Sequence, residues 1–146
     1  MGDWKQNLLE DEVRIGALVR GASRVAVLGI KTEEKADQAA YYVAKFVADH
    51  GGEVIPVPVF FPEVTEILGK KVYRKLADVP GPVDIVDVFR KPSDIDAHVD
   101  DLIAKQPRAA WFQLGIRNDA AAERLARAGI LVVQDRCLKV DWARFR

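Results

Sequence analysis

Cysteine and histidine are scarce in this 146-residue chain, which has one cysteine and two histidines. Cys137 has no partner for an internal disulfide, which favours a reducing, cytoplasmic location. Cys137, His50 and His98 are too scattered to form a zinc ligand set, so we expect no metal site. The chain also lacks a nucleophile elbow and a Cys-x-x-Cys pair. We therefore expect no catalytic residue and no enzyme activity.

Net charge is lacking as well, because 22 Lys and Arg residues balance 22 Asp and Glu residues. A general nucleic-acid binder carries an excess of positive charge, so we expect no nucleic-acid partner. No apolar run is long enough to cross a bilayer and no signal peptide opens the chain, so we expect no membrane association. The length suits a single domain spanning residues 1–146.

What the chain does have is a regular alternation of short apolar runs with amphipathic helical patterns. The expected strands span residues 24–28, 53–58, 70–73, 83–89, 109–114 and 130–133. The expected helices span residues 1–20 (with the amphipathic pattern in 3–19), 36–50, 93–105, 118–128 and 135–146, with short helical turns at 63–68 and 76–79. This alternation predicts an α/β fold with a parallel sheet in three layers and right-handed crossovers.

The first of these strands ends at a glycine. Arg24–Leu28 is followed by Gly29, then by a loop and a helix. The first phosphate-binding loop of a parallel sheet lies at such a junction, because glycine lets the backbone approach a ligand and the helix presents free N–H groups. Any α/β protein has several such junctions. The value of this one as a sign of a ligand site therefore depends on which residues the other strands bring to the same edge of the sheet.

Two tyrosines stand near the start of the helix expected over 36–50. The face expected to pack on the sheet holds Ala39, Ala40, Val43, Phe46 and Val47. Tyr42 falls on the flank of this face and Tyr41 falls nearly opposite it. We therefore expect Tyr41 to be exposed beside the ligand loop, either as a contact residue or as a half-exposed cover for its neighbours.

An ordered set of motifs gives the chain a family resemblance. They are Val-Ala-Val-Leu-Gly (25–29), Val-Ile-Pro-Val (54–57), Leu-Gly-Lys-Lys-Val-Tyr (68–73), Val-Asp-Val-Phe-Arg-Lys-Pro (86–92), Trp-Phe-Gln-Leu-Gly-Ile-Arg (111–117) and Asp-Arg-Cys-Leu-Lys-Val (135–140). In this order they resemble the small stand-alone coenzyme A-binding protein family. That family is itself similar to the coenzyme A-binding domain of succinyl-CoA synthetase α subunits.

The resemblance implies a Rossmann-type fold whose third strand, at the sheet edge, is the short segment 70–73. The first and fourth strands would then flank the topological switch point, where a nucleotide is expected. The implied ligand is coenzyme A or an acyl-coenzyme A. Its diphosphate would lie at Gly29, Ile30 and Lys31, opposite Phe89, Arg90 and Lys91; its adenosine near Val57 and Pro58; and its pantetheine arm near Gln113, Leu114, Gly115 and Ile116.

Coenzyme A carries several phosphate charges and so favours helix N-termini together with Lys or Arg. The cations available near this edge are Lys31, Lys70, Lys71, Arg90, Lys91 and Arg117. Each could equally be a solvated surface charge. We favour the surface role for Lys70 and Lys71 and the binding role for Arg90.

Two binding loops depart from the family pattern. The family has Gly-x-Ser after the first strand and an Arg-Pro-Ser-like run at the next helix, whereas residues 29–35 read Gly-Ile-Lys-Thr-Glu-Glu-Lys. The expected hydroxyl and guanidinium are missing, and Glu33, Glu34 and Asp37 add repulsive charge. The family's Val-Asn-Pro is replaced by residues 57–59, Val-Pro-Val. We therefore expect weakened binding of coenzyme A.

The same departures support an alternative function. Tyr41, Tyr42, Phe60 and Phe61 could gather at the rim of the crevice, and aromatic residues are typical of protein-interface cores. The chain would then be a protein–protein interaction module, natural or engineered, on a coenzyme A-binding scaffold. For the remaining polar groups of interest we expect structural roles; these are Asp84, Asp87, Asp135 and the thiol of Cys137.

Overall fold

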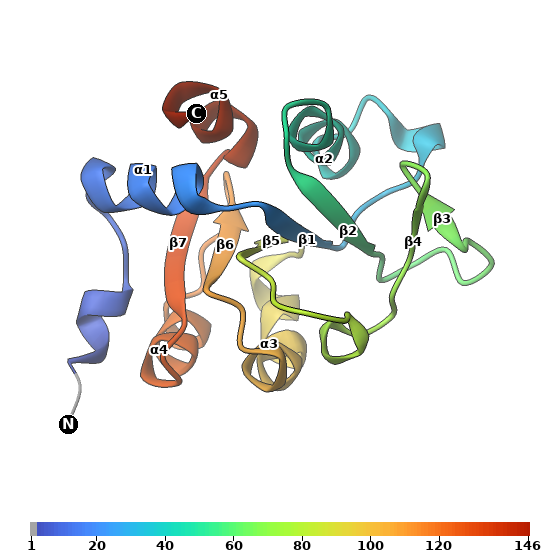
Figure 1. Ribbon diagram of the computed structural model, residues 1–146. Coiled ribbons are helices and arrows are strands. Elements are labelled where there is room, and N and C mark those ends of the chain that lie inside the picture. Colours follow the sequence, from blue (N-terminus) through green and yellow to red (C-terminus); the bar gives the residue numbers. More distant parts are fainter. Residues whose placement is uncertain (1–2) are drawn as a thin grey trace.

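Five buried segments form a parallel sheet in the computed structural model, which describes residues 3–146 (Figure 1). The strands are β1 (Arg24–Leu28), β2 (Glu53–Val57), β5 (Ile85–Val88), β6 (Ala109–Gln113) and β7 (Leu131–Arg136). They lie in the order β2-β1-β5-β6-β7, and every neighbouring pair is parallel. The three central strands are buried almost throughout, as expected for a parallel sheet covered on both faces.

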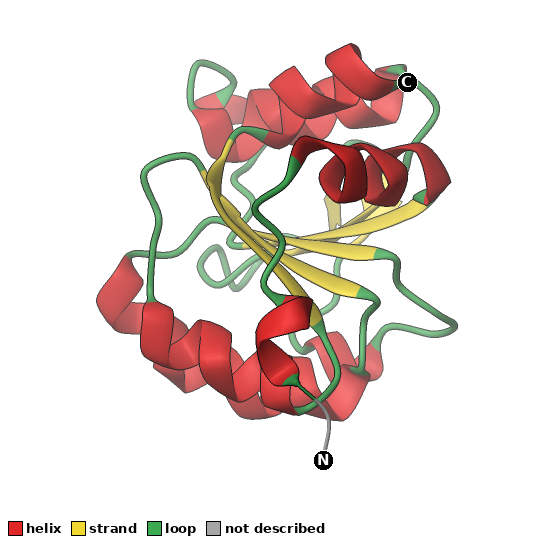
Figure 2. Ribbon diagram, turned by 90° about the vertical axis from the view of Figure 1, so that its left-hand side faces the viewer, coloured by secondary structure: helices red, strands yellow, loops and turns green. Residues whose placement is uncertain are grey.

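Helices cover the two faces of the sheet and complete three layers (Figures 1 and 2). One face carries α1 (Glu12–Gly21), α2 (Ala39–Asp49) and α5 (Leu138–Phe145), and the other carries α3 (Val99–Lys105) and α4 (Asp119–Arg127). Each face has its own apolar cluster, with Trp111 in one and Phe112 in the other, because successive strand residues point to opposite faces. The predicted three-layer, Rossmann-like α/β fold is confirmed. No helix within residues 3–146 is both long and apolar enough to span a membrane.

The amino-terminal segment differs from the single helix expected over residues 1–20, of which residues 1–2 lie outside the described part of the chain. It forms a 3-10 helix, η1 (Trp4–Asn7), followed by an extended stretch and then α1. In the extended stretch Leu8 forms a parallel bridge with Val132, and the Leu9 N–H donates to the Val132 carbonyl oxygen at 2.8 Å. The helix is interrupted because these residues extend the sheet beyond β7 (Figure 2).

The region after β2 also differs from the prediction. The helical turn expected at 63–68 is wrong, because β3 (Glu66–Ile67) lies there. A strand does lie within the expected 70–73, but this β4 (Lys70–Lys71) pairs with β3 in a separate antiparallel hairpin and not with the main sheet. The Tyr73 N–H donates to the Pro56 carbonyl oxygen at 3.0 Å, which ties the hairpin to the outer edge of β2. Pro56 has no N–H to return, so this edge does not continue as a strand ladder.

Two other helices are shorter than expected, because a different element occupies the first part of each predicted segment. The segment predicted as one helix over 93–105 is a 3-10 helix, η4 (Pro92–His98), followed by α3. The helix predicted over 135–146 begins at Leu138, because β7 stays paired with β6 as far as Arg136. Two further 3-10 helices are η2 (Glu33–Lys35) and η3 (Leu76–Asp78), the second of which matches the turn expected at 76–79.

Asp87 is the one side chain within residues 3–146 whose buried oxygen atoms lack any hydrogen-bond partner. It lies in β5, is 0% exposed, and has Val27 and Trp111 as its neighbours on the adjacent strands. Burial raises the pKa of this carboxyl well above its ordinary value. The cause is the loss of hydration, which the charged carboxylate needs more than the neutral carboxyl does.

The Asp87→Asn variant is expected to have a larger free energy of unfolding than the wild type at pH 7. This difference should narrow as the pH falls towards about 4. A carboxyl with a raised pKa in the folded state stabilises below its unfolded pKa, and this contribution is lost as the pH rises. The difference should widen from pH 4 upwards for as long as the folded protein keeps a proton that the unfolded chain has lost. Urea unfolding of both proteins from pH 4 to 8 measures this difference in free energy. A difference that does not depend on pH would contradict the raised pKa of Asp87.

Candidate functional site

The carboxyl ends of β1 and β5 emerge side by side. The Phe89 N–H donates to the Leu28 carbonyl oxygen and the Gly29 N–H donates to the Val57 carbonyl oxygen, both at 2.9 Å. The chain leaves β1 towards α2 on one face and leaves β5 towards α3 on the other (Figure 1). This reversal defines the topological switch point of the sheet, where α/β proteins bind ligands. The expected meeting of residues 29 and 89 is confirmed.

Gly29 is required at this point by both its conformation and its surroundings. Its φ is +86°, and a Cβ there would collide with the Phe89 carbonyl oxygen. The same Cβ position lies 3.3 Å from Cδ of Arg90. The absence of a side chain at Gly29 therefore lets β5 approach closely and lets the stem of Arg90 lie over the loop.

Arg90 is held in place by two residues of η4, which follows it in the chain, and by one residue from the loop after β2. Its Nε–H donates to Nε2 of His98 at 3.2 Å, and its Nη2 lies 3.5 Å from Oδ2 of Asp94. Its guanidinium carbon lies 5.4 Å from the ring centre of Phe60. Only 16% of the Arg90 side chain is exposed. A fixed, partly buried guanidinium at a glycine loop is a favourable arrangement for an anion.

The other expected cations are placed less specifically. Lys31 is half-buried and its N–H donates to the Ala40 carbonyl oxygen, which ties the loop to the first turn of α2. Lys91 is exposed after β5. Lys70 and Lys71 are exposed on the hairpin beyond β2, in keeping with the surface role favoured for them.

The remaining predicted contacts follow the neighbouring strands. Pro58 is buried directly after β2, and Ile30 is buried directly after Gly29. Gln113 is buried at the end of β6, where its Oε1 accepts the Leu138 N–H at 3.3 Å. After it, Leu114 is 65% exposed. Gly115 and Ile116 continue this loop, so all four strand ends bring their predicted residues to one edge of the sheet.

The expected four-residue aromatic patch is wrong at Tyr41. This side chain is only 6% exposed and belongs to the apolar cluster between α2 and the sheet. Ile67 of the β3–β4 hairpin is part of the same cluster, so a segment outside the main sheet contributes to this apolar layer. Burial, together with the nearby Glu33 carboxylate, raises the pKa of Tyr41.

The other three aromatic residues lie in different settings. Tyr42 is 42% exposed, with Nζ of Lys139 5.2 Å from its ring centre. Phe60 is 60% exposed and covers Arg90, whereas Phe61 is half-buried with a φ of +63°. The loop carrying both phenylalanines is held by Arg74, whose guanidinium donates to their carbonyl oxygens at 3.0 and 2.8 Å. Nothing in the sequence pattern indicated this clamp.

Two of the three aspartates singled out from the sequence hold backbone groups. Asp84 accepts the N–H groups of Ser23 and Arg24, both at 2.9 Å. Burial opposes its ionisation, but these hydrogen bonds outweigh burial and lower its pKa. Asp135 accepts the Gly115 N–H at 2.7 Å. Among the described residues, no group of three His, Cys, Asp or Glu side chains forms a metal-ion site.

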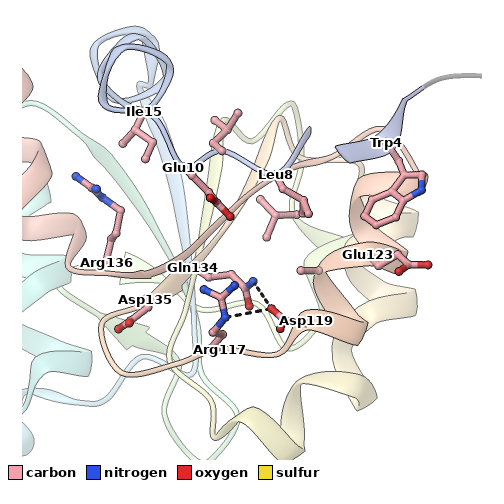
Figure 3. Close-up of a pocket in the computed structure, with 13 residues that line it drawn as sticks. Trp4, Leu8, Glu10, Ile15, Arg117, Asp119, Glu123, Gln134, Asp135 and Arg136 are labelled. Carbon is pink, nitrogen blue, oxygen red and sulfur yellow. Dashed lines mark hydrogen bonds and ion pairs between the residues drawn. The ribbon is translucent and has the colours of Figure 1, made fainter. Parts of the chain in front are cut away.

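A cavity of about 470 Å³ lies away from Gly29, at the β7 edge of the sheet (Figure 3). It is walled by the amino-terminal segment on one side and by β7 and the start of α4 on the other, with Trp4 and Glu10 on its rim. Its central charges pair with one another: Asp119 accepts from Arg117 and from Gln134, both at 3.1 Å. Arg117 therefore lies at this cavity beside Asp119, and both side chains are more than half exposed.

Residues 23–143 match the family described as the CoA binding domain. The chain belongs to this CoA-binding domain family. The protein YneT of Bacillus subtilis, described as uncharacterized, is 31% identical to it over 132 residues, which are 90% of this chain and 94% of YneT.

Two solved structures share the fold of this CoA-binding domain. The Thermus thermophilus protein "cell-free ID.343" is 34% identical, with a TM-score of 0.85 over 94% of this chain and 100% of the other. Prb, described as the PH1109 protein redesigned for binding, is 27% identical, with a TM-score of 0.84 over 94% of each chain. The overlap extends over nearly the whole of each chain.

Gly29→Ala should destabilise this CoA-binding domain more than Gly115→Ala does. Both glycines have nearly the same φ, +86° and +85°, so both substitutions carry a left-handed backbone cost of about 1–2 kcal/mol. Only the Cβ at position 29 meets other atoms, because nothing lies within 4 Å of a Cβ at Gly115. The collision should add about 1–3 kcal/mol, measured by denaturant unfolding. Equal losses would show that β5 does not approach Gly29 closely.

Proposed function

We propose that the chain binds coenzyme A or an acyl-coenzyme A between the carboxyl ends of β1 and β5, and that it does so without catalysing a reaction. The observation that carries this proposal is the position of Arg90, whose stem lies over Gly29 and whose guanidinium is fixed by His98 and Asp94. A diphosphate is the part of coenzyme A that suits a guanidinium beside a glycine loop. Membership of the CoA-binding domain family supports the choice of ligand.

The start of α2 supports the same placement. Its N-cap residue, Gln38, makes no side-chain hydrogen bond to the first turn, and that turn contains no acidic residue. The Tyr41 N–H already donates to the Gln38 carbonyl oxygen at 2.9 Å, which leaves the N–H groups of Ala39 and Ala40 to meet an anion. The helix dipole favours negative charge there. Glu33 and Glu34 are exposed in η2 of the preceding loop, so they oppose the ligand's charge and reduce its affinity.

The protein has a suitable apolar surface for each end of the ligand. Pro58 and the exposed ring of Phe60 follow β2 and suit the adenosine, since purines stack on aromatic faces. The exposed Leu114 follows β6 and suits the pantetheine arm. Asp84 and Asp135 accept hydrogen bonds from backbone N–H groups, so both have structural roles. This supports binding without catalysis.

Arg90→Gln should weaken binding of coenzyme A by about 10- to 100-fold, because it removes charge-assisted hydrogen bonds to the diphosphate. The loss should be the same for dephospho-coenzyme A, which keeps the diphosphate and lacks the ribose phosphate. Isothermal titration calorimetry with both ligands measures it. Arg124→Gln is the control, since Arg124 lies on α4 and pairs with Asp100 at 2.9 Å.

The proposed function would fail if the wild type showed neither binding heat nor thermal stabilisation with millimolar coenzyme A. The assignment of Arg90 to the diphosphate would fail if Arg90→Gln affected coenzyme A but left dephospho-coenzyme A unchanged. In that case Arg90 would contact the ribose phosphate instead.

A second candidate function is a protein-docking role for the rim of the crevice. It is favoured by the exposure of Phe60 and Leu114, which are large apolar side chains on the loops that follow β2 and β6. Phe60→Ala separates the two functions in the same titrations. If Phe60 stacks on adenosine, the variant binds coenzyme A about 5- to 100-fold more weakly. If its role is protein docking, the affinity for coenzyme A is unchanged while a pulled-down partner is lost.

A further inference from the structure

His98 is the last residue of η4, and its half-buried imidazole faces Arg90. Arg90 donates its Nε–H to Nε2 of His98 at 3.2 Å. A ring nitrogen that accepts a hydrogen bond carries no proton, so the imidazole is neutral and its proton is on Nδ1. His98 therefore acts on Arg90 as a hydrogen-bond acceptor.

The contacts of Arg90 leave one end of its guanidinium for a ligand. His98 takes the Nε–H, Asp94 lies beside Nη2 at 3.5 Å, and the ring of Phe60 covers one face. Nη1 has no hydrogen-bond partner among residues 3–146. Two fixed points on a planar group determine where its third nitrogen points, so His98 and Asp94 together set the direction of Nη1.

We propose that His98 is the positioning residue of the anion site, holding the guanidinium of Arg90 over the Gly29 loop so that Nη1 meets a phosphate oxygen. This inference rests on the proposed binding of coenzyme A. A side chain that is already ordered loses less conformational freedom when the ligand binds. Without its acceptor, Arg90 keeps its charge but loses its fixed orientation.

The charges around His98 make this positioning depend on pH. Burial and the Arg90 guanidinium lower the pKa of His98, while the carboxylates of Asp101 on α3 and Asp94 on η4 act in the opposite direction. The imidazole is thus neutral at pH 7 to 8. Acidification adds a proton at Nε2, which breaks the hydrogen bond and places two positive groups side by side. The oriented state of Arg90 is lost in the same step.

The test is a titration of dephospho-coenzyme A into the wild type, His98→Gln and His98→Leu at pH values from 8 to 5. This ligand avoids the ribose phosphate, because phosphate monoesters titrate near pH 6. The wild type should lose affinity as its imidazole takes up a proton, up to the about three- to tenfold loss expected without the acceptor. His98→Gln keeps an acceptor that does not titrate, so its affinity should match the wild type at pH 8 and stay level. His98→Leu should bind about three- to tenfold more weakly at every pH.

Two results would overturn the positioning role. An affinity that rises towards pH 5 would show that the imidazolium itself binds the ligand, and equal, level affinities in all three proteins would show that His98 does not affect the site. If the wild type binds no coenzyme A at all, the proposed function fails, and NMR of the ligand-free proteins still tests the contact. The Arg90 Nε–H should exchange slowly with solvent in the wild type and His98→Gln, and rapidly in His98→Leu. Equal exchange in all three would contradict it.

Discussion

The close pairing of β1 with β5 is the constraint on which the site depends. The Phe89 N–H continues the ladder to the Leu28 carbonyl oxygen, and the conformation of Gly29 admits no side chain between the two strand ends. Arg90 follows directly, and its stem lies over the loop. The pairing of two strands thus brings a charged group from a distant part of the sequence next to Gly29. The strand pairing sets the position of the Gly29 loop, and Arg90 brings a positive charge to it.

The parts of the fold that follow from local pattern were predictable from the sequence. Strands such as Ala109–Gln113 are apolar throughout because helices cover both faces, and Asn118 caps α4 with its side chain as its sequence position indicates. The meeting of Gly29 and Phe89 followed from parallel topology together with the family resemblance. The exposure of Tyr41 was predicted wrongly: its ring is buried in an apolar cluster that also holds Ile67, from a segment distant in the sequence.

The contacts that distinguish this site lie beyond local pattern. Asp94 stands four residues after Arg90, a spacing that indicates an ion pair on a helical segment. No comparable signal marks His98 as an acceptor for Arg90, or Arg74 as the clamp on the loop of Phe60. The amino-terminal stretch was predicted as helix because its apolar spacing is helical, yet its backbone groups bond to β7. In each case a tertiary hydrogen bond decides the outcome, and a tertiary bond leaves no periodic trace in the sequence.

The central claim is that coenzyme A occupies the crevice at the switch point of the sheet, although a cavity of about 470 Å³ is available at the β7 edge. Amide chemical-shift mapping of the labelled protein during titration with coenzyme A tests this most directly. The account predicts that the largest shifts fall at residues 29–31, at 89–91 and in the first turn of α2. Shifts concentrated instead around Trp4, Glu10 and residues 134–136, with the Gly29 loop unmoved, would contradict it.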